Sequence, residues 1–472
     1  MSVTPLPTVQ KWGCLAAVSL AGFLGSVMSL SIEMAFPVLL ERFDQPFAVV
    51  QWVILAFLCA NVALLPVVGR VADVVAQKRF FTGAYAVFIL GTLACGLAPN
   101  VGVLIAARVV QGVGFAVLAV LGFAIIARVF GPQERGTALG VDAALLSAGV
   151  IIGPTLGGVV TDYLSWRWIF LGVVPFAGLG LVLGTRYLPD VPGRRGARFD
   201  YLGGALLSLA LLTLLLALTA GQLWGFRQPV TGLLVAAFAG LSVGFVRSQT
   251  RSPEPLLELS VFRNRDLSLG IVSGLVVFSA ISGVVFLMPF YLQQVLALSA
   301  NRAGLLLSVP PALLVLCGLP AGLLTDRVGP YPLLLASLGC LLVGYLAVGT
   351  LDEATTPRRF LLAFLPLGIG MGLFSTPNSA TIMRAVRASE AGVASGLLNL
   401  SRSLGSTLGV AALGTLWSTR VAHVSDQAGV TAEAAQVLGL QRVCLVVSVG
   451  VAAVLVLTAL TWFGQRRADT LR

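Results

Sequence analysis

Two charged residues, Glu33 and Arg108, interrupt long apolar runs and are the side chains best suited to chemistry inside a membrane. Ser26 and Ser29 precede Glu33 with helical spacing, so the three residues form a polar stripe on one helix face. A charge at the bilayer centre costs about 2.5–3.5 kcal/mol, so it normally faces water or a partner. A carboxylate in that position can carry protons. Two alternatives stay open: Glu33 lies at an outer mouth, and Arg108 reaches the outer headgroups.

Two further polar positions lie inside apolar runs. Asp142 lies about two helical turns inside the cytoplasmic end of its run. It could be a second proton site, a gate partner for an arginine, or a residue of an inner vestibule, and gating is slightly favoured. Arg402 lies near the middle of a late run, close to Asn399, and the second half has no embedded acid to neutralise it. Arg402 has two equally favoured roles: it binds an anionic group of a substrate, or it holds the two halves together.

The composition requires a lipid environment for these runs. The chain has 472 residues, of which 57% are hydrophobic and 10% charged, whereas soluble domains carry about 25% charged residues. The net charge of +11 lies in short loops between apolar runs, which indicates membrane orientation and argues against nucleic-acid binding. The sequence contains no phosphate-binding loop, metal-ligand cluster or nucleophile elbow, so we expect no cofactor, no ATP-driven transport and no enzyme.

About fourteen runs between residues 12 and 463 are long enough to cross a bilayer. The excess of arginine and lysine in alternate loops predicts that both termini lie in the cytoplasm. The fold class expected is therefore an all-α integral membrane protein with about fourteen helices.

A short polar segment occurs twice, at 69–79 and 322–332, and we expect both copies to be loops between spans. Such duplication indicates two related halves, which is how transporters build a central site that opens to either side. The spacing of the copies makes the spans within 201–247 an insertion. The predicted domains are a six-helix bundle over 1–190, a two-helix insertion with its flanking loops over 191–265, and a second six-helix bundle over 266–472.

Taken in order, these segments resemble the major facilitator superfamily, specifically its fourteen-helix drug:proton antiporter branch, from about residue 15 to residue 463. The repeated segment looks like the family motif G-x-x-x-D-R-x-G-R-[KR], although Val74 and Ala76 depart from it. The resemblance implies a gate contact in which the aspartate meets a helix N-terminus; an ordinary solvated turn is the alternative. The gate residues of the two copies are Gly69, Asp73, Gly322, Asp326 and Arg327.

Residues 149–158 read G-V-I-I-G-P-T-L-G-G and resemble the family motif that marks exporters. The glycines give one smooth helix face for close contact, and the proline permits a bend. Plain packing of small residues is the alternative. The gating residues expected here are Gly149, Gly153, Pro154, Gly157 and Gly158.

The resemblance also implies that the helices carrying Glu33 and Arg108 border one central cavity, so we expect these two side chains to face each other. Met28 occupies the position at which relatives often have an aspartate. Glu33, Arg108 and Asp142 are the candidate proton-coupling residues. The expected substrate cavity is formed by Ser29, Asn61, Gln111, Asn378, Asn399 and Arg402.

The function implied is proton-coupled export of small amphipathic molecules by alternating access. The protein is expected to lie in the cell membrane and to work as a monomer. The expected partners are a small-molecule substrate, protons and the lipid bilayer. The alternative cargo is an anionic metabolite, lipid or siderophore, motivated by Met28 and by the unpaired Arg402. A membrane enzyme or a non-transporting receptor would require polar catalytic clusters or a sizeable soluble domain, and the sequence contains neither.

Overall fold

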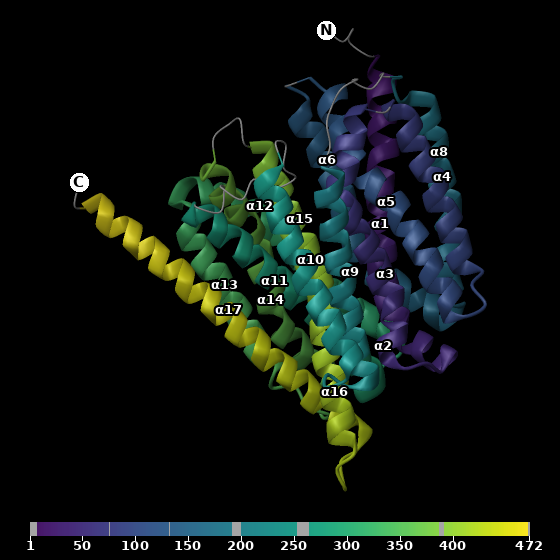
Figure 1. Cartoon of the computed structure of the whole chain (residues 1–472), viewed down its shortest axis with the longest axis vertical. Helices are drawn as coiled ribbons and strands as arrows, with labels where there is room; N and C mark the ends of the chain where they lie inside the picture. Colours follow the sequence, from purple (N-terminus) through teal and green to yellow (C-terminus); the bar gives the residue numbers. More distant parts are fainter. Residues whose placement is uncertain are drawn as a thin grey trace. The chain divides into compact units, whose positions relative to one another are not determined.

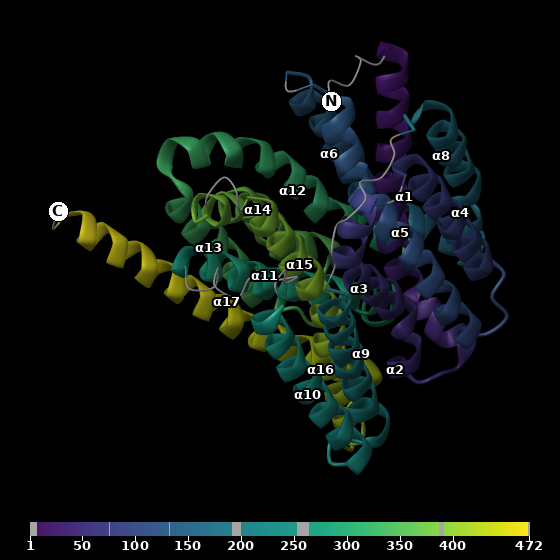
Figure 2. The ribbon, with the colours of Figure 1, turned by 45° about the horizontal axis from the view of Figure 1, so that its top comes forward.

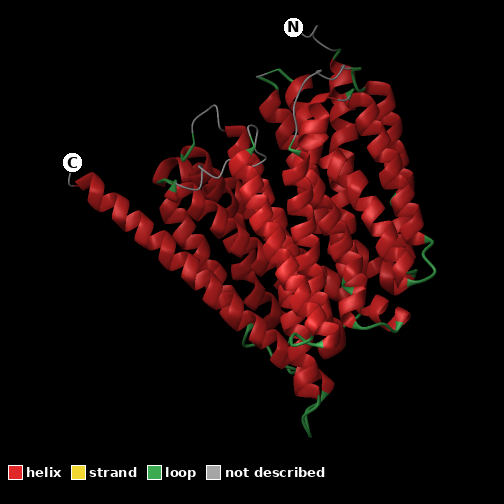
Figure 3. Ribbon diagram, in the orientation of Figure 1, coloured by secondary structure: helices red, strands yellow, loops and turns green. Residues whose placement is uncertain are grey.

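A computed structural model describes residues 7–74, 76–131, 133–190, 200–252, 264–386 and 391–470. Throughout this part of the chain the secondary structure is helical, and Figure 3 shows helices joined by loops without any strand. Within the described residues, 13 helices are long and apolar enough to cross a membrane. The all-α membrane fold expected from the composition is therefore confirmed.

The helices cluster into two compact units. The first unit is Met1–Leu256 with Ser299–Gly304, and the second is Leu257–Leu298 with Leu305–Arg472. The helices before residue 257, purple to teal in Figure 1, are α1 (Thr8–Phe43), α2 (Phe47–Val50), α3 (Trp52–Val74), α4 (Gln77–Gly96), α5 (Val101–Val129), α6 (Arg135–Tyr163), α7 (Arg167–Leu171), α8 (Val174–Tyr187), α9 (Tyr201–Trp224) and α10 (Pro229–Arg251).

In the first unit, helix α1 packs against α5, α6 and α8, while α5 also packs against α3 and α4. The helices within the predicted insertion are α9 and α10, which lie side by side (Figures 1 and 2) and cluster with this unit. Helix α9 is joined to α3 by hydrogen bonds: Trp52 Nε1 donates to Thr219 Oγ1 at 2.9 Å, and Ser208 Oγ donates to the Ala63 carbonyl at 3.3 Å.

The later helices are α11 (Arg265–Phe290), α12 (Ala300–Val328), α13 (Pro330–Val348), α14 (Pro357–Arg384), α15 (Ala391–Leu408), α16 (Gly414–Ser425) and α17 (Ala432–Thr470). Helix α12 belongs to the first unit through Gly304 and to the second from Leu305. Within the second unit, α13 packs against α14 and α17, and α11 packs against α15.

One expected span lies outside the 13 apolar helices. This span, residues 391–416 of the fourteen apolar runs counted in the sequence, is formed by α15, a π-helical turn at Gly409–Leu413 and the start of α16. Asn399, Arg402 and several serines make α15 less apolar than the other spans. Its polar residues therefore mark it as a helix that needs polar surroundings on one face.

The two repeated segments are mostly helical, so the expectation of loops at 69–79 and 322–332 is wrong. Helix α3 continues to Val74, and α12 continues to Val328. The residues between the glycine and the aspartate include no helix breaker, so each helix runs on. In the second copy the turn comes only at Gly329, whose φ of 84° lies in the left-handed region that glycine tolerates best.

Candidate functional site

The interior of the first unit holds a polar network around Arg108. This residue is only 1% exposed, and its Nε donates to the Val53 carbonyl at 2.8 Å. Its Nη1 donates to Gln111 Oε1 at 2.6 Å, and its guanidinium carbon lies 4.4 Å from the ring centroid of Phe57. These contacts replace water around a buried cation. Arg108 is therefore held by its surroundings, and it does not reach out to the membrane surface.

Gln111 is fully buried and completes this network. Its Nε2 donates to Thr92 Oγ1 at 2.8 Å and to the sulfur of Met28 at 3.6 Å. Thr92 in turn donates to the Phe88 carbonyl at 2.6 Å. Met28 thus contacts the network at the position where the resemblance leads one to expect an aspartate. A thioether accepts hydrogen bonds only weakly, so this position contributes no charge.

Glu33 lies on α1, half-buried, within electrostatic range of Arg108. No guanidinium nitrogen of Arg108 comes within 4.0 Å of a Glu33 carboxylate oxygen, so the two residues form no ion pair. Glu33 also has no hydrogen-bond partner among the described residues. The two expected residues are thus near each other, but the cation is engaged elsewhere and the carboxylate is not.

Asp142 lies on α6, half-buried. Its Oδ1 accepts a 2.7 Å hydrogen bond from Ser19 Oγ of α1, and Ser19 is fully buried. The partner in this arrangement is a hydroxyl, not the arginine that a gating pair would need. Asp142 therefore joins α1 to α6 at the level of Ser19.

The glycine face of α6 lies directly against α1. A methyl group added at Gly157 would lie 2.6 Å from Cα of Ser31, and one at Gly149 would lie 2.7 Å from the Phe23 carbonyl oxygen. Gly153 is close enough for its carbonyl to accept a 2.8 Å hydrogen bond from Ser31 Oγ. Only hydrogen fits at these positions, so the glycines permit the close approach of the two helices.

The same helix carries Asp162, which we did not single out in the sequence. Its Oδ1 accepts from the backbone N–H of Ala300 at 3.1 Å, and its Oδ2 accepts from that of Asn301 at 2.8 Å. These are the first residues of α12 and cluster with the first unit. Gly158 and Pro154 adjoin the same turn, since a methyl group at Gly158 would collide with the Ala300 carbonyl and one at Gly304 with that of Pro154. Asp162 thus supplies the N-terminal cap of α12.

A signal for Asp162 was available in the sequence. It lies in the last turn of its own helix, where the helix dipole disfavours an anion. Such an acid needs donors from elsewhere in the fold, and the N-terminus of another helix supplies them. The partner itself could not be read from the sequence.

In the second unit, Arg402 lies on α15, and its Nη2 donates to Ser379 Oγ of α14 at 3.0 Å. Its guanidinium carbon lies 5.4 Å from the ring centroid of Phe278. Its Nε is buried without a hydrogen-bond partner, and so are both amide atoms of the neighbouring α14 residue Asn378, which is fully buried. Buried polar groups are normally paired, so these atoms mark a place where polar ligand atoms would fit.

The remaining expected residues lie apart from these networks. Ser29 and Asn61 are half-buried, and Asn399 is exposed. In the repeated segments, Asp326 and Arg327 are exposed and Gly322 is half-buried. Gly69 and Asp73 belong to the backbone of α3, but their side chains lie outside the described residues.

Membrane-crossing helices, close helix packing at glycines and polar side chains buried within the spans are the features of a multi-pass membrane transporter. The sequence model of the Major Facilitator Superfamily matches residues 18–410. The chain belongs to this superfamily: it is a secondary transporter of the cell membrane and not an enzyme.

Relatives within the superfamily carry transport names. The riboflavin transporter RibZ of Clostridioides difficile (strain 630) is 28% identical over 85% of this chain and 87% of its own length. The multidrug resistance protein Stp of Mycobacterium tuberculosis (strain CDC 1551 / Oshkosh) is 31% identical over 85% of this chain and 75% of its own. A bacterial homologue of the human lysosomal transporter Spinster, solved inward-facing and unoccupied, shares the fold with a TM-score of 0.67 and 15% identity over 96% of this chain and 97% of its own.

Proposed function

We propose that this transporter exports small amphipathic molecules in exchange for protons, with Glu33 as the proton carrier. The observation that carries this proposal is the unequal bonding of two neighbouring charges. Arg108 is held by Val53 and Gln111, whereas Glu33 has no hydrogen-bond or ion-pair partner in the described part of the chain. A carrier must gain and lose a proton repeatedly, so a free carboxylate suits the task better than a locked ion pair.

Arg108 has a supporting role in this mechanism. Because its own hydrogen bonds do not depend on Glu33, it stays in place when Glu33 is protonated. Its positive charge then acts on the carboxylate through space, without a hydrogen bond between the two side chains. Protonation and release would bias the two access states differently, which couples proton movement to substrate movement.

Two observations support the proposal of export by alternating access: the glycine motif of α6 and the names of related proteins. Close packing of α6 on α1 at Gly149 and Gly157 supports a helix pair that seals one side, with Pro154 as the bending element. The name of the Mycobacterium tuberculosis relative Stp, a multidrug resistance protein, agrees with efflux of drugs or toxins. We propose that the carrier works as a monomer of two six-helix bundles over 1–190 and 266–472, with 191–265 inserted.

The repeated segments are proposed as cytoplasmic gate contacts. Asp73 and Asp326 both fall in the last turn of their own helices. That position is unfavourable for an anion, so each carboxylate gains from a neighbouring helix N-terminus or a cation. Asp142, hydrogen-bonded to Ser19 of α1, stays the second candidate for proton coupling.

The proton role is tested with Glu33→Gln in proteoliposomes that carry a pH gradient. The variant should retain its fold, since Glu33 makes no hydrogen bond within the described part of the chain. It should lose gradient-driven substrate movement while exchange without a gradient persists. Glu41→Gln is the matched control, because Glu41 is exposed on the same helix. Gradient-driven movement that survives in Glu33→Gln would move the carrier to another group, with Asp142 the next to examine.

A second candidate function, export of an anionic metabolite, lipid or siderophore, is favoured by the unpaired Nε of Arg402 and the unpaired amide of Asn378. Cells that express the protein separate the two candidates. Ethidium efflux supports the amphipathic cargo. Absence of efflux, together with binding of anionic compounds that Arg402→Ala loses and Arg384→Ala keeps, supports the anionic cargo; Arg384 is exposed at the end of α14. The name of the relative RibZ adds riboflavin to the compounds to be screened.

A further inference from the structure

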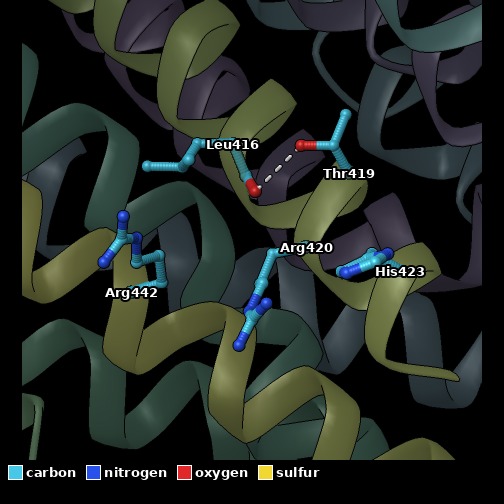
Figure 4. Close-up of a pocket in the computed structure, with 5 residues that line it drawn as sticks. All are labelled: Leu416, Thr419, Arg420, His423 and Arg442. Atoms are coloured by element: carbon cyan, nitrogen blue, oxygen red, sulfur yellow. Dashed lines mark hydrogen bonds between the residues drawn. The ribbon is translucent and has the colours of Figure 1, made fainter. Parts of the chain in front are cut away.

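A basic pocket of about 440 Å³ opens at the junction of α16 and α17 in the second unit. Figure 4 shows Leu416, Thr419, Arg420 and His423 on α16 and Arg442 on α17 around the hollow. Its volume falls within the range of small-ligand sites, roughly 300–1,000 Å³. None of the described residues that line it is acidic. His423 is the single histidine of the chain.

The basic side chains around this pocket have no partner among the described residues. Arg420, Arg442 and His423 make no hydrogen bond or ion pair within the described part of the chain. Both arginines line the same hollow, so it carries positive charge that an anion would neutralise. Arginine favours phosphate and carboxylate oxygens because its planar fork donates two parallel hydrogen bonds.

The position of Arg442 along α17 matches a membrane interface. This helix runs without interruption to Thr470, and Arg466 lies 24 residues beyond Arg442 in its sequence. At 1.5 Å per residue the two positions are about 36 Å apart, close to the roughly 40 Å that separates the headgroup layers of a bilayer. The pocket therefore lies at headgroup height, at the end of α17 away from the C-terminus.

An apolar stripe continues from the pocket towards the membrane centre. Leu445, Val446 and Val449 follow Arg442 at helical spacings of three, four and seven residues, so they share its face of α17. Their side chains are 51%, 42% and 64% exposed. A cationic pocket with an exposed apolar stripe below it has the polarity of a phospholipid: a phosphate on top and acyl chains beneath.

We propose that this pocket binds the phosphate of an anionic membrane phospholipid, whose acyl chains lie along Leu445, Val446 and Val449. The lipid neutralises Arg420 and Arg442 and fastens α16 to α17 at the membrane surface. This site is separate from the proposed proton and substrate residues, and it does not depend on the direction or cargo of transport.

The test is native mass spectrometry of the purified full-length protein, titrated with phosphatidylglycerol, phosphatidylcholine or inorganic phosphate. Wild type should bind phosphatidylglycerol more tightly than the zwitterionic lipid. The double variant Arg420→Gln/Arg442→Gln should bind it at least about tenfold more weakly, since each basic side chain near a membrane surface contributes about 1 kcal/mol. Arg358→Gln is the matched control, because Arg358 is exposed, begins α14 and does not line the pocket.

Each other outcome would overturn the proposal. Equal phosphatidylglycerol affinity in the double variant and in Arg358→Gln would remove the pocket as the site. Equal binding of phosphatidylcholine would remove headgroup charge as the basis of recognition. Displacement of the bound lipid by millimolar inorganic phosphate would make the pocket a site for soluble anions. All the variants should keep the wild-type melting temperature in phosphatidylcholine vesicles, since the replaced side chains are exposed.

Discussion

The guanidinium of Arg108 donates a 2.6 Å hydrogen bond to Oε1 of Gln111, one turn farther along α5. The charge is thus held from within its own helix. The side-chain amide of Gln111 donates in turn to Thr92 Oγ1 and to the sulfur of Met28. A buried cation that is fastened in this way keeps its place whatever the protonation state of nearby Glu33. Arg108 is therefore a fixed positive charge near Glu33, and its position does not depend on an ion pair with Glu33.

Removal of the amide should therefore weaken the first unit. In Gln111→Ala, a buried donor of Arg108 loses its acceptor, which should lower the free energy of unfolding by about 2 kcal/mol. The measurement is the thermal unfolding midpoint of the purified protein in detergent. Gln427→Ala is the control, since Gln427 is exposed. An unchanged midpoint in Gln111→Ala would show that the hydrogen bond to Arg108 contributes no stability.

The contact of α6 with α1 predicts a sharp difference between two glycines of one helix. Gly157→Ala places a methyl group 2.6 Å from Ser31 Cα, which should destabilise the packing by about 1–3 kcal/mol and slow transport. Gly140→Ala meets nothing within 4 Å and should be neutral or slightly stabilising. Transport rate and melting temperature, measured on both variants, check this. Equal behaviour of the pair would contradict close packing at Gly157.

The cap of α12 by Asp162 can be measured at the amides that it binds. Asp162→Ala removes both acceptors and should speed hydrogen exchange at Ala300 and Asn301 by roughly fivefold, the equivalent of about 1 kcal/mol. Asp162→Asn keeps an acceptor without the charge, so its exchange rates should lie between those of wild type and Asp162→Ala. Asp426→Ala, at an exposed aspartate, serves as the control. If the exchange rates in Asp162→Ala match wild type, the cap does not hold this turn.

The loop before α14 should respond to acid through Asp352. Hydrogen bonds from Thr355 Oγ1 and from Arg359 hold the pKa of this carboxyl below its usual value of 3.8. Because the folded pKa is lower than the unfolded one, the contribution is complete above about pH 4 and is lost as the pH falls through the folded pKa.

Hydrogen exchange measures this response at Ala354, whose amide donates to Asp352 Oδ1 at 3.1 Å. The protection factor of this amide should be constant from pH 7 to about pH 4 and should fall below it. Asp352→Asn should show weaker protection at neutral pH and little further change in acid. Protection that persists in wild type well below pH 3 would refute the proposed role of the carboxylate.

Much of the fold was predictable because apolar length and helical periodicity are local properties. Runs of about 20 apolar residues predict spans wherever they occur, and the structure has helices at those places. The helix ends were less predictable. The polar repeats at 69–79 and 322–332 suggested loops, but polarity alone does not break a helix.

The sequence by itself determined the membrane class, the superfamily and the few embedded polar residues, because each depends on residue types within one segment or motif. Only the tertiary structure decided which polar side chains have hydrogen-bond partners and which do not. Arg108 binds a carbonyl 55 positions away, and Asp162 binds amides 138 and 139 positions away. Such partners are set by how helices pack, since a hydrogen bond needs atoms within about 3 Å whatever their distance along the chain. Packing thus left Glu33 without a hydrogen-bond partner among the described residues and placed Arg108 within electrostatic range of it.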